Sequence, residues 1–159
     1  MANMKQVFAA AMLAAIAITA IAYAQLLTGT ITVDTEERLA VQSTMNLDKI
    51  PARAVHSQTF QKAINVTLTD ISGSNALIGV ELVADDLDIY KGFRAFVVQI
   101  KPSGGGDVLA VLTLSNPYAE FELNCGSDYN LDVVVIYAAG TQPVSNVNVR
   151  LGATIKAIY

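Results

Sequence analysis

Residues 147–159 read VNVRLGATIKAIY, and the alternation of their side chains decides the fold class. Every second residue from Val147 to Tyr159 is apolar, and the positions between them are mainly polar, with Ile158 as the exception. A period of two gives a β-strand one apolar and one polar face. The stretch therefore predicts a strand that places its apolar face in a hydrophobic core.

Similar runs recur through the chain, separated by turn-forming clusters of Gly, Pro, Asn and Ser. They occupy residues 38–45, 63–69, 76–84, 93–100, 108–114, 118–123 and 131–137. Together with a run at residues 27–33 they make about eight or nine short strands, a number typical of two packed antiparallel sheets. The sequence predicts an all-β fold, an antiparallel, jelly-roll-like β-sandwich that occupies residues 38–159.

Three segments differ from this simple alternation. Residues 133–136 are apolar throughout, which predicts a central strand that is covered on both faces. Residues 48–58 show no clear period and are predicted to form a loop that crosses between sheets. Residues 85–90 are predicted to form one helical turn.

The N-terminus has the features of a secretory signal. Residues 7–24 carry no charge, Lys5 precedes them, and Ala22 and Ala24 flank Tyr23 in the pattern that signal peptidase accepts. We expect residues 1–24 to be removed as a signal peptide and the protein to be extracellular or on the cell surface. A retained hydrophobic helix is the alternative, because about 18 apolar residues reach the lower limit for a membrane span. Otherwise the membrane is a partner only during export.

Residues 25–37 are predicted to form an N-terminal strand and a linker. Leu27, Gly29, Ile31 and Val33 alternate with threonines, and this pattern continues to Asp34. A helix could not easily continue through Gly29 and the β-branched residues that follow it. The segment is therefore predicted to be a strand from its first residues.

The charge balance argues against nucleic acid as a partner. The chain has fourteen acidic and ten basic residues, and removing Lys5 with the signal leaves nine basic residues in the exported part. Proteins that bind a phosphate backbone cluster Lys and Arg, whereas these nine are scattered singly. An acidic, solvated surface is expected.

Catalytic and metal-binding patterns are missing from the sequence. His56 is the only histidine, so a blue-copper site and an HExxH zinc site are excluded, and a catalytic triad would have to use this residue. Asp85, Asp86 and Asp88 could bind calcium through their carboxylate oxygens or form a solvated turn. The sequence predicts no enzyme activity and no cofactor.

Two further residues carry possible covalent chemistry. Cys125 is the only cysteine, which excludes an internal disulfide and leaves a free thiol or an intermolecular link. Asn65 begins the sequon Asn65-Val66-Thr67 on the polar face of a predicted strand, so N-glycosylation is possible in an exported protein.

After cleavage the strand at residues 27–33 would be a tail, free to complete the sheet of a neighbouring subunit. Residues 20–34, AIAYAQLLTGTITVD, and the alternating runs after them resemble TasA-type biofilm fibre subunits and archaeal bundling pilins. The resemblance implies a homopolymer, an extracellular pilus or biofilm matrix fibre built by donor-strand complementation, and bundling with neighbouring filaments. Some relatives are described as camelysin-type peptidases, but this sequence lacks the metal-ligand spacing for such an activity.

Other functions stay open. A type IV pilin or archaellin-like subunit would keep its N-terminal helix, although Gly29 and the Thr-rich strand interrupt such a helix early. A surface-anchored binding module for a ligand or carbohydrate is disfavoured by the absence of Trp, because sugar platforms generally use exposed aromatic faces. An uncharacterised hydrolase is the remaining alternative.

Overall fold

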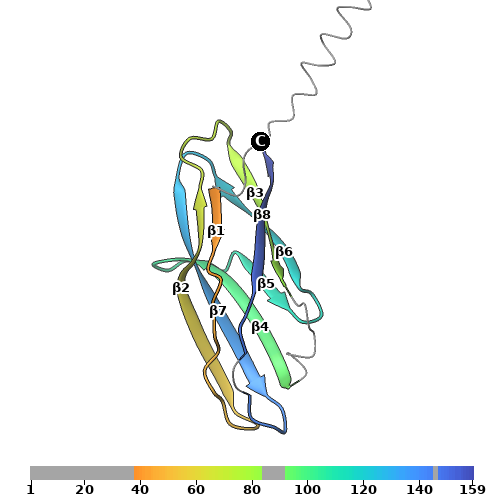
Figure 1. Cartoon of the computed structure of the whole chain (residues 1–159). Coiled ribbons are helices and arrows are strands. Elements are labelled where there is room, and N and C mark those ends of the chain that lie inside the picture. Colours follow the sequence, from red (N-terminus) through yellow and green to blue (C-terminus); the bar gives the residue numbers. More distant parts are fainter. Residues whose placement is uncertain (1–37, 84–91, 145–146) are drawn as a thin grey trace, which may run out of the picture. The chain divides into compact units, whose positions relative to one another are not determined.

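The computed structural model describes residues 38–83, 92–144 and 147–159, and its elements there are β-strands (Figure 1). None of the described residues forms a helix long and apolar enough to cross a membrane. The prediction of an all-β fold is confirmed. The strands are β1 (Leu39–Val41), β2 (Val55–Thr67), β3 (Asn75–Leu82), β4 (Phe93–Pro102), β5 (Ala110–Thr113), β6 (Tyr118–Asn124), β7 (Asp128–Ala139) and β8 (Leu151–Ile158).

The strands form two antiparallel sheets. The order is β1-β2-β7-β4-β5 in the five-stranded sheet and β6-β3-β8 in the three-stranded sheet. Strands β4 and β5 form a hairpin whose connection contains Gly104, Gly105 and Gly106, all at positive φ, which glycine adopts without a steric penalty. β1 and β8, which begin more than a hundred residues apart, are edge strands of different sheets.

One hydrophobic cluster contains side chains of both sheets. Ile78 and Val80 of β3 and Val133 and Val135 of β7 are fully inaccessible to solvent. Among the described residues no polar or charged side chain is fully buried. Apolar burial is therefore the main stabilising contribution to this fold.

The prediction of a loop over residues 48–58 is wrong for its last four residues, because β2 begins at Val55. The period is hidden because the inward positions of this part of β2 carry the polar side chains of His56 and Gln58. The Gln58 amide accepts a hydrogen bond from the Asp48 N–H (2.9 Å) and donates one to the Asn46 carbonyl (3.0 Å). Polar inward positions are thus satisfied by the backbone of a neighbouring segment.

The predicted strand at residues 38–45 is also shorter than expected, because β1 ends at Val41. The chain beyond it is joined to Val147 and Val149 by backbone hydrogen bonds. The Leu47 N–H donates to the Val147 carbonyl (2.8 Å), and the Val149 N–H donates to the Met45 carbonyl (2.8 Å). Val147 and Val149 are buried as expected, although they precede β8.

The last strand departs from strict alternation at a bulge. Ile155 pairs with Ile78 and Ala157 pairs with Leu77, which leaves Lys156 as the extra residue. A one-residue slip exchanges the two faces of a strand. Ile158 therefore packs against the core, whereas Ala157 and Tyr159, predicted to be on the apolar face, are exposed.

Two aspartates near the start of β7 bond to the segments beside it. Asp128 accepts hydrogen bonds from the Thr69 hydroxyl (2.6 Å) and from the backbone N–H groups of Leu68 and Thr69, and these bonds lower its pKa. Asp132 accepts from the Ser103 hydroxyl and from the Lys62 N–H, which lowers its pKa as well. Both carboxylates therefore favour the folded state in their charged form.

This arrangement predicts a loss of stability in acid. Because folding lowers both pKa values below 3.8, the stabilisation is present above that pH and is lost as the pH falls through the folded-state values. The double variant Asp128→Asn, Asp132→Asn should melt at a lower temperature than the wild type at neutral pH. The two melting temperatures should converge toward about pH 2. Asp107→Asn, in the exposed β4–β5 loop, is the control, and a constant difference between wild type and double variant at every pH would contradict the assignment.

Candidate functional site

The outer edge of β8 lies beside β1 without pairing to it. In the sheet order β8 has β3 as its neighbour, while β1 pairs with β2, although β1 and β8 are in contact. Within the described ranges no backbone hydrogen bond joins the two strands. One edge of β8 therefore presents backbone N–H and C=O groups that have no strand partner in this part of the chain.

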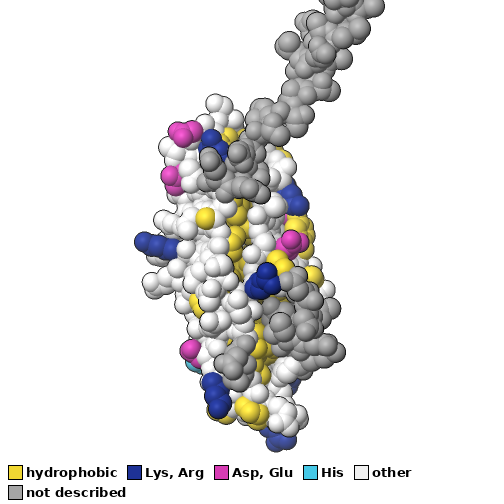
Figure 2. All heavy atoms as spheres, in the orientation of Figure 1, with side chains coloured by type: hydrophobic (Ala, Val, Ile, Leu, Met, Phe, Trp, Pro, Cys, Tyr) yellow, Lys and Arg dark blue, Asp and Glu magenta, His cyan; other side chains and the backbone are white. Residues whose placement is uncertain are grey.

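The side chains along this edge are incompletely covered. Ala153, Ile155 and Ile158 face the core but are only half-buried, and so is Val41 of β1. The corresponding β3 side chains are fully buried. Figure 2 shows hydrophobic side chains in a line between the positions of β1 and β8. We call these four residues, together with the outer backbone edge of β8, the β8 edge.

The chain that follows β1 is bonded to the chain that precedes β8. Residues 45–50 bond to Val144, Val147 and Val149, including the reciprocal backbone bonds between Ile50 and Val144 (2.9 and 3.0 Å). From Leu151 onward the chain pairs with β3 alone in the described residues. The outer edge of β8 is thus unpaired in the described residues, whereas the chain just before β8 is bonded to residues 45–50.

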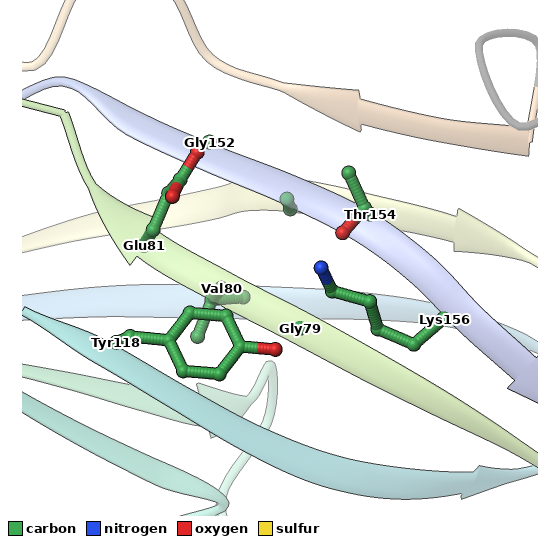
Figure 3. A pocket seen from close by; sticks show the side chains of 8 residues that line it. Gly79, Val80, Glu81, Tyr118, Gly152, Thr154 and Lys156 are labelled. Atoms are coloured by element: carbon green, nitrogen blue, oxygen red, sulfur yellow. The ribbon is translucent and has the colours of Figure 1, made fainter.

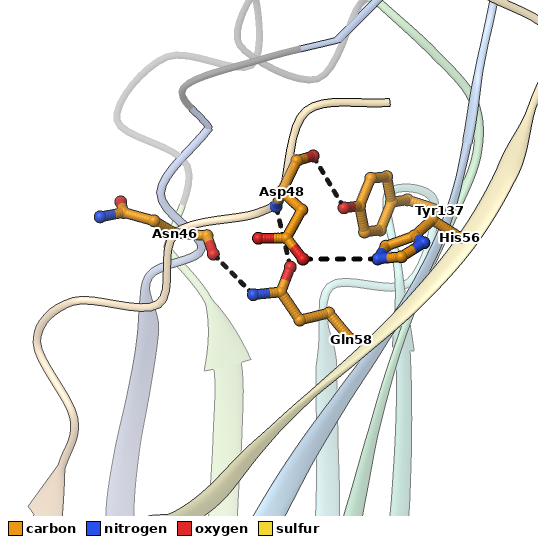
Figure 4. A network of polar contacts seen from close by, with 5 residues as sticks. All are labelled: Asn46, Asp48, His56, Gln58 and Tyr137. Carbon is orange, nitrogen blue, oxygen red and sulfur yellow. Dashed lines mark hydrogen bonds and ion pairs between the residues drawn. The ribbon is translucent and has the colours of Figure 1, made fainter. Parts of the chain in front are cut away.

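His56 belongs to a polar network that holds residues 46–48 in place (Figure 4). Its Nε2 lies 3.6 Å from Asp48 Oδ2, and the Tyr137 hydroxyl donates to the Asp48 carbonyl (3.0 Å). Burial raises the pKa of Tyr137. The network contains amide, carboxylate, imidazole and phenol groups but no serine or cysteine, so it does not form a nucleophilic triad. Its role is to attach residues 46–48 to β2 and β7.

His56 was expected in an exposed loop, whereas it lies on a strand with its side chain 43% exposed. The described residues contain no group of three or more His, Cys, Asp or Glu side chains that could hold a metal ion. Asp85, Asp86 and Asp88, the candidate calcium ligands, lie outside the described residues, and so does the helical turn predicted at 85–90.

Chelation is expected to leave the melting temperature unchanged. His56→Ala should lower it only slightly, because the variant loses one edge contact with the Tyr137 ring and an ion pair that is largely solvent-exposed. Thermal melts with and without EDTA, on the wild type and on His56→Ala, measure both effects. A large drop with EDTA would instead indicate a calcium site at Asp85, Asp86 and Asp88.

The outer face of the three-stranded sheet has a shallow hollow of about 60 Å³ (Figure 3). Tyr118 and Lys156 lie over Gly79, where an added Cβ would come within 2.8 Å of each side chain, and the Lys156 ammonium is 5.6 Å from the Tyr118 ring. A hydrogen bond to Glu120 raises the pKa of Tyr118. Small-molecule sites usually enclose about 300 Å³ or more. The hollow is therefore best explained by the two long side chains that shield a glycine.

The remaining predicted site residues are distributed as follows. The predicted strand residues Leu27, Gly29, Ile31 and Val33 lie outside the described residues. Asn65 is exposed on β2, as expected for a sequon on the polar face. Cys125 is half-buried in the turn between β6 and β7, with a free thiol.

The β8 edge could not be predicted from the sequence. Alternation at residues 151–155 predicts a half-buried strand, but only the topology places that strand at the margin of its sheet. No protein-family model matches the chain, and no curated protein matches it either. The β8 edge is therefore interpreted from its own geometry.

Proposed function

We propose that the chain is the structural subunit of an extracellular filament, in which residues 27–33 of one copy add as a strand to the β8 edge of the next copy. The observation that carries the proposal is the open β8 edge, with its unpaired backbone and half-buried Ala153, Ile155 and Ile158. In this proposal the two sheets are the halves of a jelly-roll-like sandwich. The three-stranded sheet then lacks one strand, next to β8.

The proposed donor fits this position in length and pattern. β8 has eight residues, and residues 27–33 alternate over a similar span with Leu27, Ile31 and Val33 on one face. These side chains would cover the half-buried side chains of β8, and the donor backbone would bond to its outer edge. Burial of three aliphatic side chains contributes roughly 4 to 9 kcal/mol before ordering costs. Such a junction would be persistent.

Assembly follows from the separation of donor and acceptor on the same chain. The donor precedes β1 and the acceptor is β8, so each copy can give a strand to one neighbour and receive a strand from another. Contacts of this head-to-tail type generate open filaments. Cleavage after Ala24 would leave residues 25–37 as the connecting tail. The proposed role is structural, without enzymatic activity or a cofactor.

The acceptor is tested by two lysine substitutions at neighbouring positions of β8. Ile155→Lys places a charge on the core side of the β8 edge, whereas Thr154→Lys places the same charge on the exposed outer side. We expect the Ile155→Lys protein to stay folded by circular dichroism but to form no filaments in negative-stain microscopy. Thr154→Lys should assemble normally. Normal assembly of both variants would show that β8 is not the acceptor.

The N-terminus of the exported protein distinguishes this proposal from a pilin that retains its helix. Intact mass and N-terminal sequencing should show a chain that begins at Gln25. A chain that retains residues 7–24 in the filament would favour a type IV pilin or archaellin-like subunit instead, because such proteins bundle that helix in the filament core.

A further inference from the structure

The outer face of the five-stranded sheet carries three consecutive rows of uncharged side chains, and Arg94, at the β4 bulge, lies at the margin of the first row. The register of β2, β7, β4 and β5 places these residues side by side. We call them the neutral face: Val55, Ala138 and Ala95; Ser57, Ile136, Val97 and Thr113; and Thr59, Val134, Gln99 and Val111.

This face is apolar in its centre, and its side chains are half-buried or exposed except for the buried Ala138. Val55 is 65% and Val111 is 45% exposed, and Val97, Val134 and Ile136 are half-buried. Residues 133–136 were expected to be covered on both faces. Val133 and Val135 are indeed in the core, but nothing among the described residues covers the side chains that alternate with them. A strand that is apolar on both faces is typical of a sheet with a second layer.

Charged side chains lie at both margins of the neutral face and on the exposed positions of the three-stranded sheet. Lys101 of β4 and Asp132 of β7 are neighbours in the strand register at the margin of the neutral face. The three-stranded sheet carries Glu81, Glu120 and Glu122 on its exposed positions. Two copies that met through that sheet would bring carboxylates together, and two copies that met through unlike faces would desolvate charges without partners.

We propose that the neutral face of one copy packs on the neutral face of a second copy. An acidic chain repels its own copies, so approach is favoured where both surfaces lack charge. Contact between like faces needs no complementary charge and is isologous. The Val, Ile and Thr side chains of this face pack well on a pleated surface.

The size of the face determines when such pairs form. With strands about 4.8 Å apart and about 3.4 Å per residue, three rows on four strands cover about 400 Å² per copy. A stable interface usually buries about 800 Å² on each partner. A single pair is therefore weak, and it becomes stable when many copies are linked in a row. This step rests on the proposed filament and predicts that filaments associate side by side through their neutral faces.

The first test introduces a charge at the centre of the face in the full-length, exported protein. Filaments of the wild type should associate laterally in negative-stain images and sediment at low speed. Val134→Lys should give dispersed single filaments of normal length, and Asn124→Lys, which adds the same charge to β6 of the other sheet, should behave as the wild type. Lateral association of Val134→Lys at the wild-type level overturns the proposal.

A second test does not depend on filaments. In a Cys125→Ser background, Val134→Cys should cross-link between copies with a short bis-maleimide at high protein concentration, and Thr154→Cys should not. If the wild-type chain forms no filaments, the proposed function fails. A Val134→Cys cross-link would still support the face-to-face pair, and the absence of that cross-link would overturn it.

Discussion

Deletion of residues 25–34 should abolish filament formation and leave a folded, β-rich monomer. The strands and the hydrophobic core of the described structure begin at Leu39, so the deletion removes none of their side chains. It removes the proposed donor, whose three aliphatic side chains contribute most of the junction. Negative-stain microscopy, sedimentation velocity and circular dichroism measure assembly, size and fold on the same sample.

Point variants provide the matched controls for this deletion. Ile31→Asp should prevent assembly because it places a charge at the centre of the apolar face of the donor, whereas Thr30→Ser on the opposite face should have little effect. A synthetic peptide of residues 25–34 should bind the truncated protein and raise its melting temperature. If the truncated chain unfolds, the strand belongs to its own sheet; if it polymerises normally, donor-strand assembly is refuted.

Tyr137→Ala should lower the free energy of unfolding by about 3 to 5 kcal/mol, as expected for the loss of a large buried aromatic side chain. The Tyr137 side chain is fully inaccessible, and its ring meets Phe93 edge to face at 5.6 Å. Its hydroxyl also donates a hydrogen bond to the Asp48 carbonyl, and this bond attaches residues 46–48 to β7. Urea unfolding of the Ile31→Asp chain, which we expect to be monomeric, measures the change.

Tyr137→Phe separates the ring from the hydroxyl. It keeps the aromatic contacts and loses one hydrogen bond, so it should cost about 1 kcal/mol. Equal losses for the Ala and Phe variants would contradict a role for the ring in the core. Loss of the hydroxyl should also increase hydrogen exchange at the Asp48 and Ile50 amides, because residues 46–50 would be held less firmly.

Local patterns predicted much of the fold, and they failed where tertiary contacts determine the structure. Alternation at residues 151–155 was sufficient because these side chains separate cleanly into two environments. It failed at His56 and Gln58, whose polar side chains face inward to bind the backbone at residues 46–48. It also failed beyond Ile155, because the bulge at Lys156 depends on pairing with β3, which local sequence does not contain.

The candidate site shows the same division. The alternation at residues 27–33 predicts a strand with one apolar face that needs to be buried, and this can be seen in the sequence alone. Its proposed acceptor depends on β1 and β8 lying side by side, although they are separated by most of the domain. Likewise, residues 133–136 were correctly identified as a central strand. No local pattern, however, says whether the outer face of that strand is covered by the same chain or by another copy.

If the chain is exported as proposed, the position of β8 as the last of the eight described strands determines the order in which donor and acceptor emerge. The proposed donor leaves the membrane first, whereas the acceptor is complete only after residues 151–158 have crossed and paired with β3. Pairing between segments so distant in sequence is slow compared with local folding. A partly translocated chain therefore carries a donor but no acceptor. In the proposed assembly, such a subunit cannot receive a donor strand from a neighbour before residues 151–158 have crossed the membrane.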